Sequence, residues 1–293
     1  MIKRDVVEFV LVAFGMAILT AAALAIVAPF VPRGVQAALV ALLYMPSPLV
    51  AALVATRREG SWNWLRGVAG TGAGWWPVFR TAAVASVAIM VWWLLIAAVA
   101  DAMAIPGAGR PVPPFGELDM PAGLLPEGLP PPKLPPPWLA MLIGPVAGLA
   151  AGFTVNGLVA FGEEAGWRGF LLPRTPAGIH PDLFVGVPWG LWHAPLILLG
   201  HNYGDAAGPW GLFGVMAMVV LCIGLSRLLR VATIRSGSVI TAAAIHGGVN
   251  GTAPLLTLLV RDGNPIVAVP VGVLGALAAW CASRAIGGPG RGR

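Results

Sequence analysis

The sequence predicts an all-α membrane protein, a polytopic bundle of about eight transmembrane helices. Hydrophobic residues make up 58% of the 293 residues, charged residues make up only 10%, and the mean hydropathy is +0.84. A soluble domain of this size needs a charged surface that this composition cannot supply, whereas several apolar runs reach the length that crosses a bilayer. The same composition excludes a disordered chain and a small disulfide-stapled fold.

Eight apolar stretches, each of roughly 17–25 residues, are the candidate spans. They lie near residues 6–31, 35–55, 81–100, 139–161, 183–199, 210–229, 238–260 and 266–283. Pro46 and Pro48 predict a kink in the second span. The first span follows Lys3 and Arg4, as the apolar core of a signal peptide would, but its length favours a retained anchor.

Lysine and arginine are distributed unevenly over the segments that connect these spans. An eight-span arrangement places fourteen of them on one side and four on the other, namely Arg33, Arg110, Lys133 and Arg261. Basic residues collect in cytoplasmic loops, so this predicts a multi-pass protein of the cell membrane with both termini in the cytoplasm. The net charge of +6 therefore reflects topology, and nucleic acid is not an expected partner.

Three regions are expected along the chain. Residues 1–137 hold the first helices, an interfacial segment and a proline-rich exterior loop; 138–255 form the core that carries the chemistry; 256–293 hold the last span and a basic tail. Twelve of the 28 prolines lie in 105–137, which predicts an extended spacer, with a binding role as the alternative. Four tryptophans among arginine and glycine in 61–76 predict a segment in the cytoplasmic interface.

Ionisable and imidazole side chains inside apolar sequence are the informative polar residues, because burying them is costly and usually functional. They occur in three of the predicted spans and comprise Glu163, Glu164, Arg168, His193, His246 and Asn250. Counted along a helix, Glu163, His193 and His246 lie roughly 13–17 Å from the predicted cytoplasmic ends of their spans. This common level predicts a single site inside the bundle that is open to the cytoplasm.

Helical spacing separates the roles of the two glutamates. Residues four apart share a helix face, so Arg168 is expected to neutralise Glu164, while Glu163, about 100° around the helix, faces the imidazoles. Trp189 shares a face with His193 by the same spacing. The alternative is a wholly structural buried ion pair accompanied by packing histidines.

These residue types suit hydrolysis. A carboxylate beside an imidazole in a low-dielectric cavity can deprotonate a water that attacks a carbonyl, and a second histidine with an asparagine can stabilise the oxyanion. Glu163, His193 and His246 are also legitimate zinc ligands, but they come singly from separate helices with no H-E-x-x-H pair, so a metal is left open. Cys222 and Cys281 lie in apolar runs and are expected to be buried hydrophobic residues.

Three motifs occur in order on these spans: EExxxR at 163–168, WxxxH at 189–193 and HxxxN at 246–250. In order and approximate separation, they resemble the CPBP family of intramembrane proteases over roughly 138–255. That family includes the type II CAAX prenyl endopeptidases and bacterial proteins grouped with abortive infection or bacteriocin self-immunity. The resemblance implies a CAAX-protease-like helical core.

The resemblance also implies a role for each matched position. Glu163 and His193 activate the attacking water, and His246 and Asn250 stabilise the oxyanion. The supporting residues are Glu164, Arg168 and Trp189, the last standing where the family commonly has Phe.

The expected function is that of an intramembrane endopeptidase. It hydrolyses a peptide bond of a membrane-associated peptide or protein through Glu/His-activated water in a cytoplasm-facing cavity, within the lipid bilayer. A catalytically silent scaffold or immunity protein is one alternative. A proton-coupled transporter is the other, because buried carboxylates and histidines also build proton relays. The inverted repeats typical of transporters are not evident in the sequence.

Overall fold

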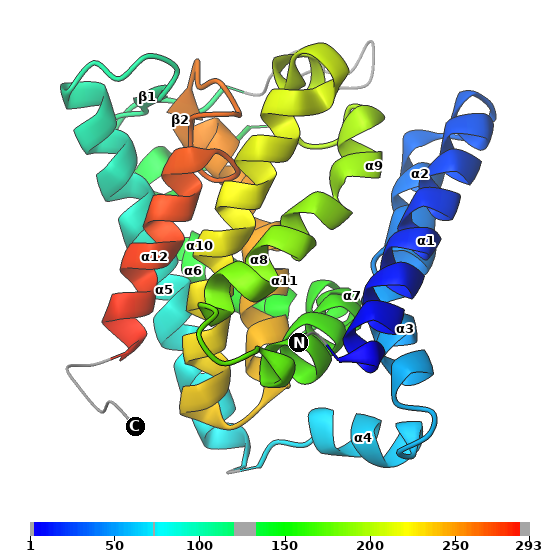
Figure 1. The fold of residues 1–293 in the computed structure, drawn as a ribbon. Coiled ribbons are helices and arrows are strands. Elements are labelled where there is room, and N and C mark those ends of the chain that lie inside the picture. The colour runs from blue at the N-terminus through cyan, green and yellow to red at the C-terminus, as the bar shows by residue number, and fades with distance from the viewer. Residues whose placement is uncertain (1–2, 73, 120–132, 288–293) are drawn as a thin grey trace.

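The computed structural model is a bundle of helices that run between two ends of the molecule (Figure 1), and it confirms the predicted all-α class. It describes residues 3–72, 74–119 and 133–287. The proline triplet of 130–132 lies outside these residues, so the middle part of the predicted spacer, 120–132, is untested. The flanks of that spacer, 105–119 and 133–136, form turns and extended chain with one short strand.

The helices and strands of the described chain follow in order. They are α1 (Arg4–Val27), η1 (Ala28–Phe30), α2 (Arg33–Leu39), η2 (Val40–Tyr44), α3 (Ser47–Ala55), α4 (Ser61–Val68), α5 (Trp75–Ala102), β1 (Arg110–Pro111), α6 (Pro137–Gly152), α7 (Val155–Glu164), η4 (Ala165–Leu171), η5 (Leu172–Arg174), α8 (Pro181–Trp192), α9 (Ala194–Leu198), η6 (Gly204–Ala207), η7 (Pro209–Gly211), α10 (Leu212–Ser236), α11 (Val239–Leu259), β2 (Val260–Arg261) and α12 (Val273–Gly287). The segments η2 and η4 are π-helical, and the other η segments are 3₁₀-helical.

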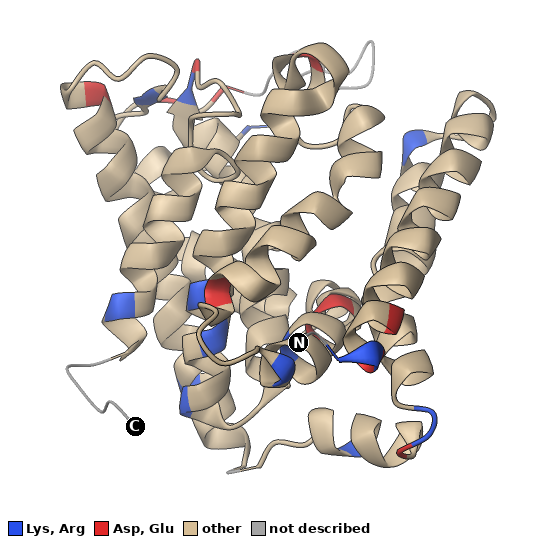
Figure 2. Ribbon diagram, viewed as in Figure 1, with Lys and Arg blue, Asp and Glu red and all other residues tan. Residues whose placement is uncertain are grey.

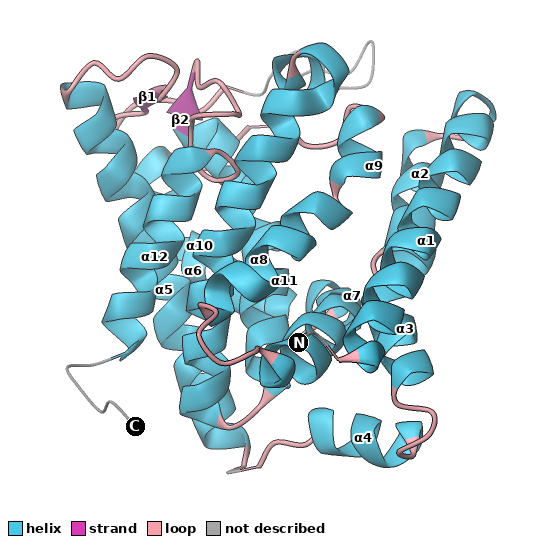
Figure 3. Ribbon diagram, in the orientation of Figure 1, coloured by secondary structure: helices cyan, strands magenta, loops and turns pink. Residues whose placement is uncertain are grey.

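The two ends of the bundle differ in charge (Figure 2). We call the end formed by residues 3–5, 56–72, 172–182 and 230–238 the basic end, since lysine and arginine gather there. The opposite end, formed by 28–33, 103–119, 199–211 and 260–272, is the strand end. It carries β1 and β2, which pair antiparallel between two loops (Figure 3). Helix α4 lies across the basic end, as an interfacial segment would.

All eight predicted spans are at least partly helical, but they do not all meet the length and hydropathy of a membrane crossing. Within the described residues four helices do: Arg4–Phe30, Arg33–Ala55, Trp75–Ala102 and Pro209–Ser236. Counting the bent pair α6 and α7–η5 as one span makes five. Helix α12 is too short, α8 and α9 are separated at His193, and α11 carries His246, Asn250 and several glycines that lower its hydropathy.

Several boundaries differ from those predicted. Helix α5 begins at Trp75, before the predicted start at 81, so the interfacial segment is shorter than expected. Helix α12 begins at Val273, because turns that contain Pro265 and Pro270 occupy the start of the predicted span. The expected proline kink is present as a turn at Met45–Pro46, between η2 and α3.

The fourth predicted span is broken where continuous helix was expected. Helices α6 and α7 meet at an angle of 62°. Thr154, at the break, has a non-helical backbone, with φ −125° and ψ −138°. Gly152 and Gly157 flank it so closely that a Cβ on Gly157 would lie 1.7 Å from the Gly152 carbonyl oxygen. The bend therefore needs glycine, and it turns α7 with its two glutamates into the bundle.

Glycines spaced four apart let the helices around the site approach closely, a common device in membrane bundles. On α8, a Cβ added at Gly186 would lie 2.6 Å from Ile223 Cα, and one at Gly190 would lie 2.4 Å from Val219 Cα. Both contacts are with the backbone of α10. The backbones of α8 and α10 thus touch along one helical face, and that contact holds Trp189 and the α8–α9 junction in place.

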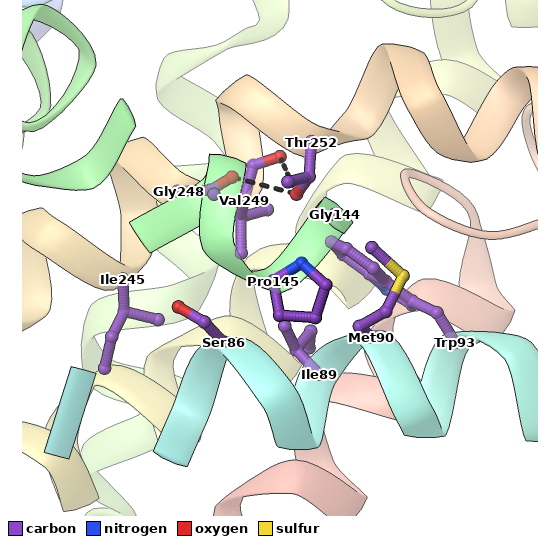
Figure 4. Close-up of a pocket in the computed structure, with 11 residues that line it drawn as sticks. Ser86, Ile89, Met90, Trp93, Gly144, Pro145, Ile245, Gly248, Val249 and Thr252 are labelled. Carbon is purple, nitrogen blue, oxygen red and sulfur yellow. Dashed lines mark hydrogen bonds between the residues drawn. The ribbon is translucent and has the colours of Figure 1, made fainter. Parts of the chain in front are cut away.

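Helix α6 uses the same device against α11. A Cβ at Gly148 would lie 2.8 Å from Thr252 Cγ2, and the Thr252 hydroxyl donates to the Gly248 carbonyl at 2.8 Å. Figure 4 shows the small cavity that remains between these helices and α5, with Met90 and Trp93 opposite Gly144. Its volume is about 10 Å³, about the room of a single water. Close packing on this side leaves α11 firmly supported behind His246.

Replacing Gly190 with alanine is expected to destabilise the protein, because the added methyl group collides with the α10 backbone. The cost is about 1–3 kcal/mol, as for other overpacked cores. Thermal unfolding in detergent measures it. Gly15→Ala is the matched control, since a Cβ there meets nothing within 4 Å. Equal melting temperatures for the two variants would contradict the close α8–α10 contact.

Candidate active site

The predicted site residues come from four neighbouring parts of the chain. Glu163 and Glu164 end α7, and Arg168 lies in the π-helical turn η4 that follows. His193 lies at the junction of α8 and α9, and His246 lies in α11. Single π-turns often mark functional sites, because the wider turn redirects side chains.

Glu164 and Arg168 form the predicted ion pair, and both side chains are fully buried. Arg168 Nη1 lies 2.9 Å from each carboxylate oxygen of Glu164, and Nη2 donates to Ser226 Oγ on α10 at 3.1 Å. His246 Nδ1 lies 2.8 Å from Glu164 Oε1, and because a carboxylate accepts, Nδ1 carries the proton. The expectation that Glu163 alone would face the imidazoles is corrected here, since Glu164 binds His246 directly.

Trp189 contacts four of the charged or imidazole groups of the site. Its indole N–H donates to Glu163 Oε2 at 2.8 Å, and its carbonyl oxygen accepts from His193 Nδ1 at 2.8 Å. The Arg168 guanidinium lies 4.2 Å from the indole ring centre, in cation–π contact, and the His246 ring meets the indole edge to face at 5.3 Å. Trp189 is therefore more than an apolar wall.

One cavity of about 570 Å³ brings the predicted residues together. Glu163, His193, His246 and Asn250 all line it, and so does Trp189. Glu164 and Arg168 lie behind this lining, in the protein interior. The structure thus gathers a carboxylate, two imidazoles and a carboxamide from separate helices around one space. The catalytic role of each residue stays a prediction.

The cavity extends toward the strand end. Along α11 its lining changes from the buried His246 to the exposed Asn250, Pro254 and Thr257. Exposed residues of the strand end, such as His201 and Asn202, line it as well. A cavity open to the cytoplasm was expected, which would place its mouth at the basic end. The lining does not support that expectation.

Sequence reasoning missed several residues of the site. Tyr44 lines the cavity, and its hydroxyl donates to the Trp192 carbonyl oxygen, while Trp192 Nε1 donates to Ser47 Oγ at 3.1 Å. Cys222 is buried, as predicted, and it also lines the cavity, whereas Cys281 is only partly buried, against the prediction. Tyr44 and Ser47 could have been noticed as polar residues beside the prolines of an apolar run. Ser226 lies in an apolar span without any such signal.

The candidate zinc ligands do not assemble into a metal site. Among the described residues no three His, Cys, Asp or Glu side chains are grouped so that they could hold a metal ion. His193 Nδ1 is bound to the Trp189 carbonyl, and Glu163 Oε2 receives the indole N–H. The donor set does not fit zinc in this arrangement.

Fold and site together define a multi-pass helical membrane protein with a polar site enclosed in its core. Residues 138–252 match the family model described as type II CAAX prenyl endopeptidase Rce1-like. This match, over about two fifths of the chain, supports the resemblance to the CPBP family of intramembrane proteases that the motifs predict. No curated protein and no solved structure gives a significant match.

Replacing Arg168 with methionine is expected to destabilise the protein strongly. The substitution keeps the length of the side chain but leaves the Glu164 carboxylate buried without its cation, at a cost of about 3–5 kcal/mol. Thermal unfolding in detergent measures the loss. Arg110→Met is the matched control, because Arg110 pairs with Asp262 on the surface and its loss is expected to leave the melting temperature unchanged. Equal effects of the two substitutions would refute the structural role of the buried pair.

Proposed function

We propose that this protein is an intramembrane endopeptidase that hydrolyses a peptide bond of a membrane-associated peptide or protein. The observation that carries the proposal is the cavity shared by Glu163, His193, His246 and Asn250. The match of residues 138–252 to the type II CAAX prenyl endopeptidase Rce1-like model supports protease activity at the level of the family. The chain is a multi-pass membrane protein, and the bias of its basic residues supports a cell-membrane location with both termini in the cytoplasm.

In the proposed reaction, Glu163 acts as general base. Its Oε2 is held by the indole of Trp189, which leaves Oε1 for a water molecule. His193 donates Nδ1–H to a carbonyl oxygen, so its Nε2 is an acceptor that can align the same water. The water gives a proton to Glu163 as its oxygen bonds to the carbonyl carbon of the substrate. The C–N bond then breaks, and Glu163 returns the proton to the leaving amine.

Two groups are assigned to the oxyanion that forms when water attacks. The Asn250 carboxamide donates one hydrogen bond. In its protonated form, His246 keeps Nδ1–H on Glu164 and offers Nε2–H to the developing charge. Donors held in a water-poor cavity stabilise such a charge far more than donors in bulk water do. The buried Glu164 and Arg168 orient His246 and do not meet the substrate.

The alternatives make different demands on the same residues. A proton-coupled transporter needs a site that is reachable from both ends of the bundle, whereas the cavity lining runs toward one end. A catalytically silent scaffold or immunity protein would keep its biological effect without Glu163 and His193. An enzyme would lose its biological effect when either residue is replaced.

Replacing Glu163 with glutamine is expected to abolish peptide cleavage, because the amide cannot accept the proton of the attacking water. Loss of a general base lowers the rate by about 10²–10⁴. Mass spectrometry of membrane peptides from cells that express each form measures it. Glu117→Gln, in the strand-end loop, is the control. Identical peptides from the Glu163→Gln and unmodified proteins at equal membrane levels would disprove the assignment.

Replacing Trp189 with phenylalanine tests the positioning of the base. Phenylalanine keeps an aromatic ring against Arg168 and His246 but lacks the N–H that holds Glu163. A hydrogen bond to a charged group contributes about 1.5–3 kcal/mol, so kcat is expected to fall about 10-fold or more while KM changes little. The assay uses a peptide identified in the previous experiment. Trp62→Phe, on the exposed face of α4, is the control, and a pure rise in KM would instead make Trp189 a substrate contact.

A further inference from the structure

We infer that the active-site cavity opens on the outer side of the membrane and takes uncharged, apolar peptide segments from there. This inference rests on the proposed function and adds the direction of entry and the class of substrate. It differs from the cytoplasm-facing cavity expected from helix depth alone.

Exposure along the cavity shows where its mouth lies. Glu163, Cys222 and His246 form the deep part and are at most 5% exposed. Thr257, near the end of α11, and Asn202, in the loop after α9, form the shallow part and are exposed. Asn202 belongs to the strand end, and Thr257 lies three residues before its segment 260–272. A substrate that enters past these residues reaches Glu163 at the bottom.

Ion pairs and packed aromatic residues close the opposite end. Asp182, at the start of α8, accepts from Arg230 Nε and Nη2 on α10 at 2.5 and 3.0 Å. Arg174 Nε donates to Asp5 at 2.7 Å and so joins η5 to α1. Trp167, in η4, is fully buried and in edge contact with Phe9 of α1. The elements around the site are therefore tied together on the side of the basic end.

Charge places the closed end in the cytoplasm. Eight of the eighteen lysines and arginines lie in the segments that define that end, where Figure 2 shows basic residues gathered, whereas the segments that define the strand end hold three. Two of the three basic residues of the strand-end segments are paired with aspartates: Arg110 with Asp262 and Arg261 with Asp119. The strand end thus carries little free positive charge, as expected for the end of the bundle on the outer side of the membrane. The mouth of the cavity lies on that side.

The lining selects for the chemistry of the substrate. Of the described residues that line the cavity, Glu163 alone is a carboxylate, and none is lysine or arginine. Most of the rest are apolar, among them Met218, Leu221 and Leu225 of α10. A charged side chain would lose its hydration here without finding a partner. The outer end of a hydrophobic membrane segment fits this wall, whereas a tail displayed only in the cytoplasm does not reach it.

Thiol labelling tests the direction of entry. In a Cys222→Ala/Cys281→Ala background, one cysteine is placed at the mouth, as Thr257→Cys or Asn202→Cys, and another at the basic end, as Glu59→Cys. A membrane-impermeant maleimide is added to spheroplasts, in which the outer face of the sealed cell membrane is accessible. It is expected to label the mouth cysteines and not Glu59→Cys. Inside-out vesicles are expected to give the reverse. Mouth cysteines labelled only in inside-out vesicles, or from neither side, would overturn the inference.

Blocking the mouth tests entry of the substrate. Labelling Thr257→Cys or Asn202→Cys with a bulky impermeant maleimide is expected to reduce peptide cleavage at least 10-fold relative to the same variant unlabelled. Labelled Glu59→Cys is expected to keep its activity. Unchanged cleavage after complete labelling at both mouth positions would show that substrate enters elsewhere. The labelling pattern does not depend on catalysis, so failure of the inference is distinct from failure of the proposed function, which Glu163→Gln reports.

Discussion

The buried ion pair between Glu164 and Arg168 is the interaction on which the rest of the site depends. An unpaired charge in the bundle interior is energetically costly, and two adjacent glutamates at the end of α7 raise that cost. Arg168 neutralises Glu164, and its Nη2 donates to Ser226. Glu164 in turn binds His246. One charge-balanced cluster thereby ties η4, α10 and α11 together and leaves Glu163 free to line the cavity.

Trp189 converts this structural cluster into a polar site with defined orientations. Its indole and carbonyl groups hold Glu163 and His193, and its ring lies against Arg168. These contacts are possible only because α8 lies close to α10, at the distance that Gly186 and Gly190 permit. A tryptophan at this position therefore depends on glycines on either side of it. The orientation of the polar groups therefore depends on the close helix packing, since a looser contact between α8 and α10 would free Trp189 to move.

Much of the site could be predicted because spacing along a helix determines which side chains share a face. The Glu164–Arg168 pair follows from that rule, whereas the meeting of Glu163, His193 and His246 at one cavity follows from their common distance from the ends of their spans. The bend between α6 and α7 could not be predicted from hydropathy, because a break of two residues between two apolar helices leaves the mean hydropathy unchanged. The glycines at 144, 148, 152, 186 and 190 are visible in the sequence, but the sequence does not show which helix packs against each of them.

The end of the bundle at which the cavity opens does not follow from helix spacing, for a physical reason. The rise along a helix gives the distance of a residue from one end, and by that measure the site lies nearer the basic end. The mouth of a cavity depends instead on what fills the space at each end. At the basic end the space is taken by Trp167 and by the ion pairs of Asp182 and Arg174. At the strand end α11 becomes exposed past Asn250, so the cavity reaches the surface of the bundle on that side although its polar residues lie nearer the basic end.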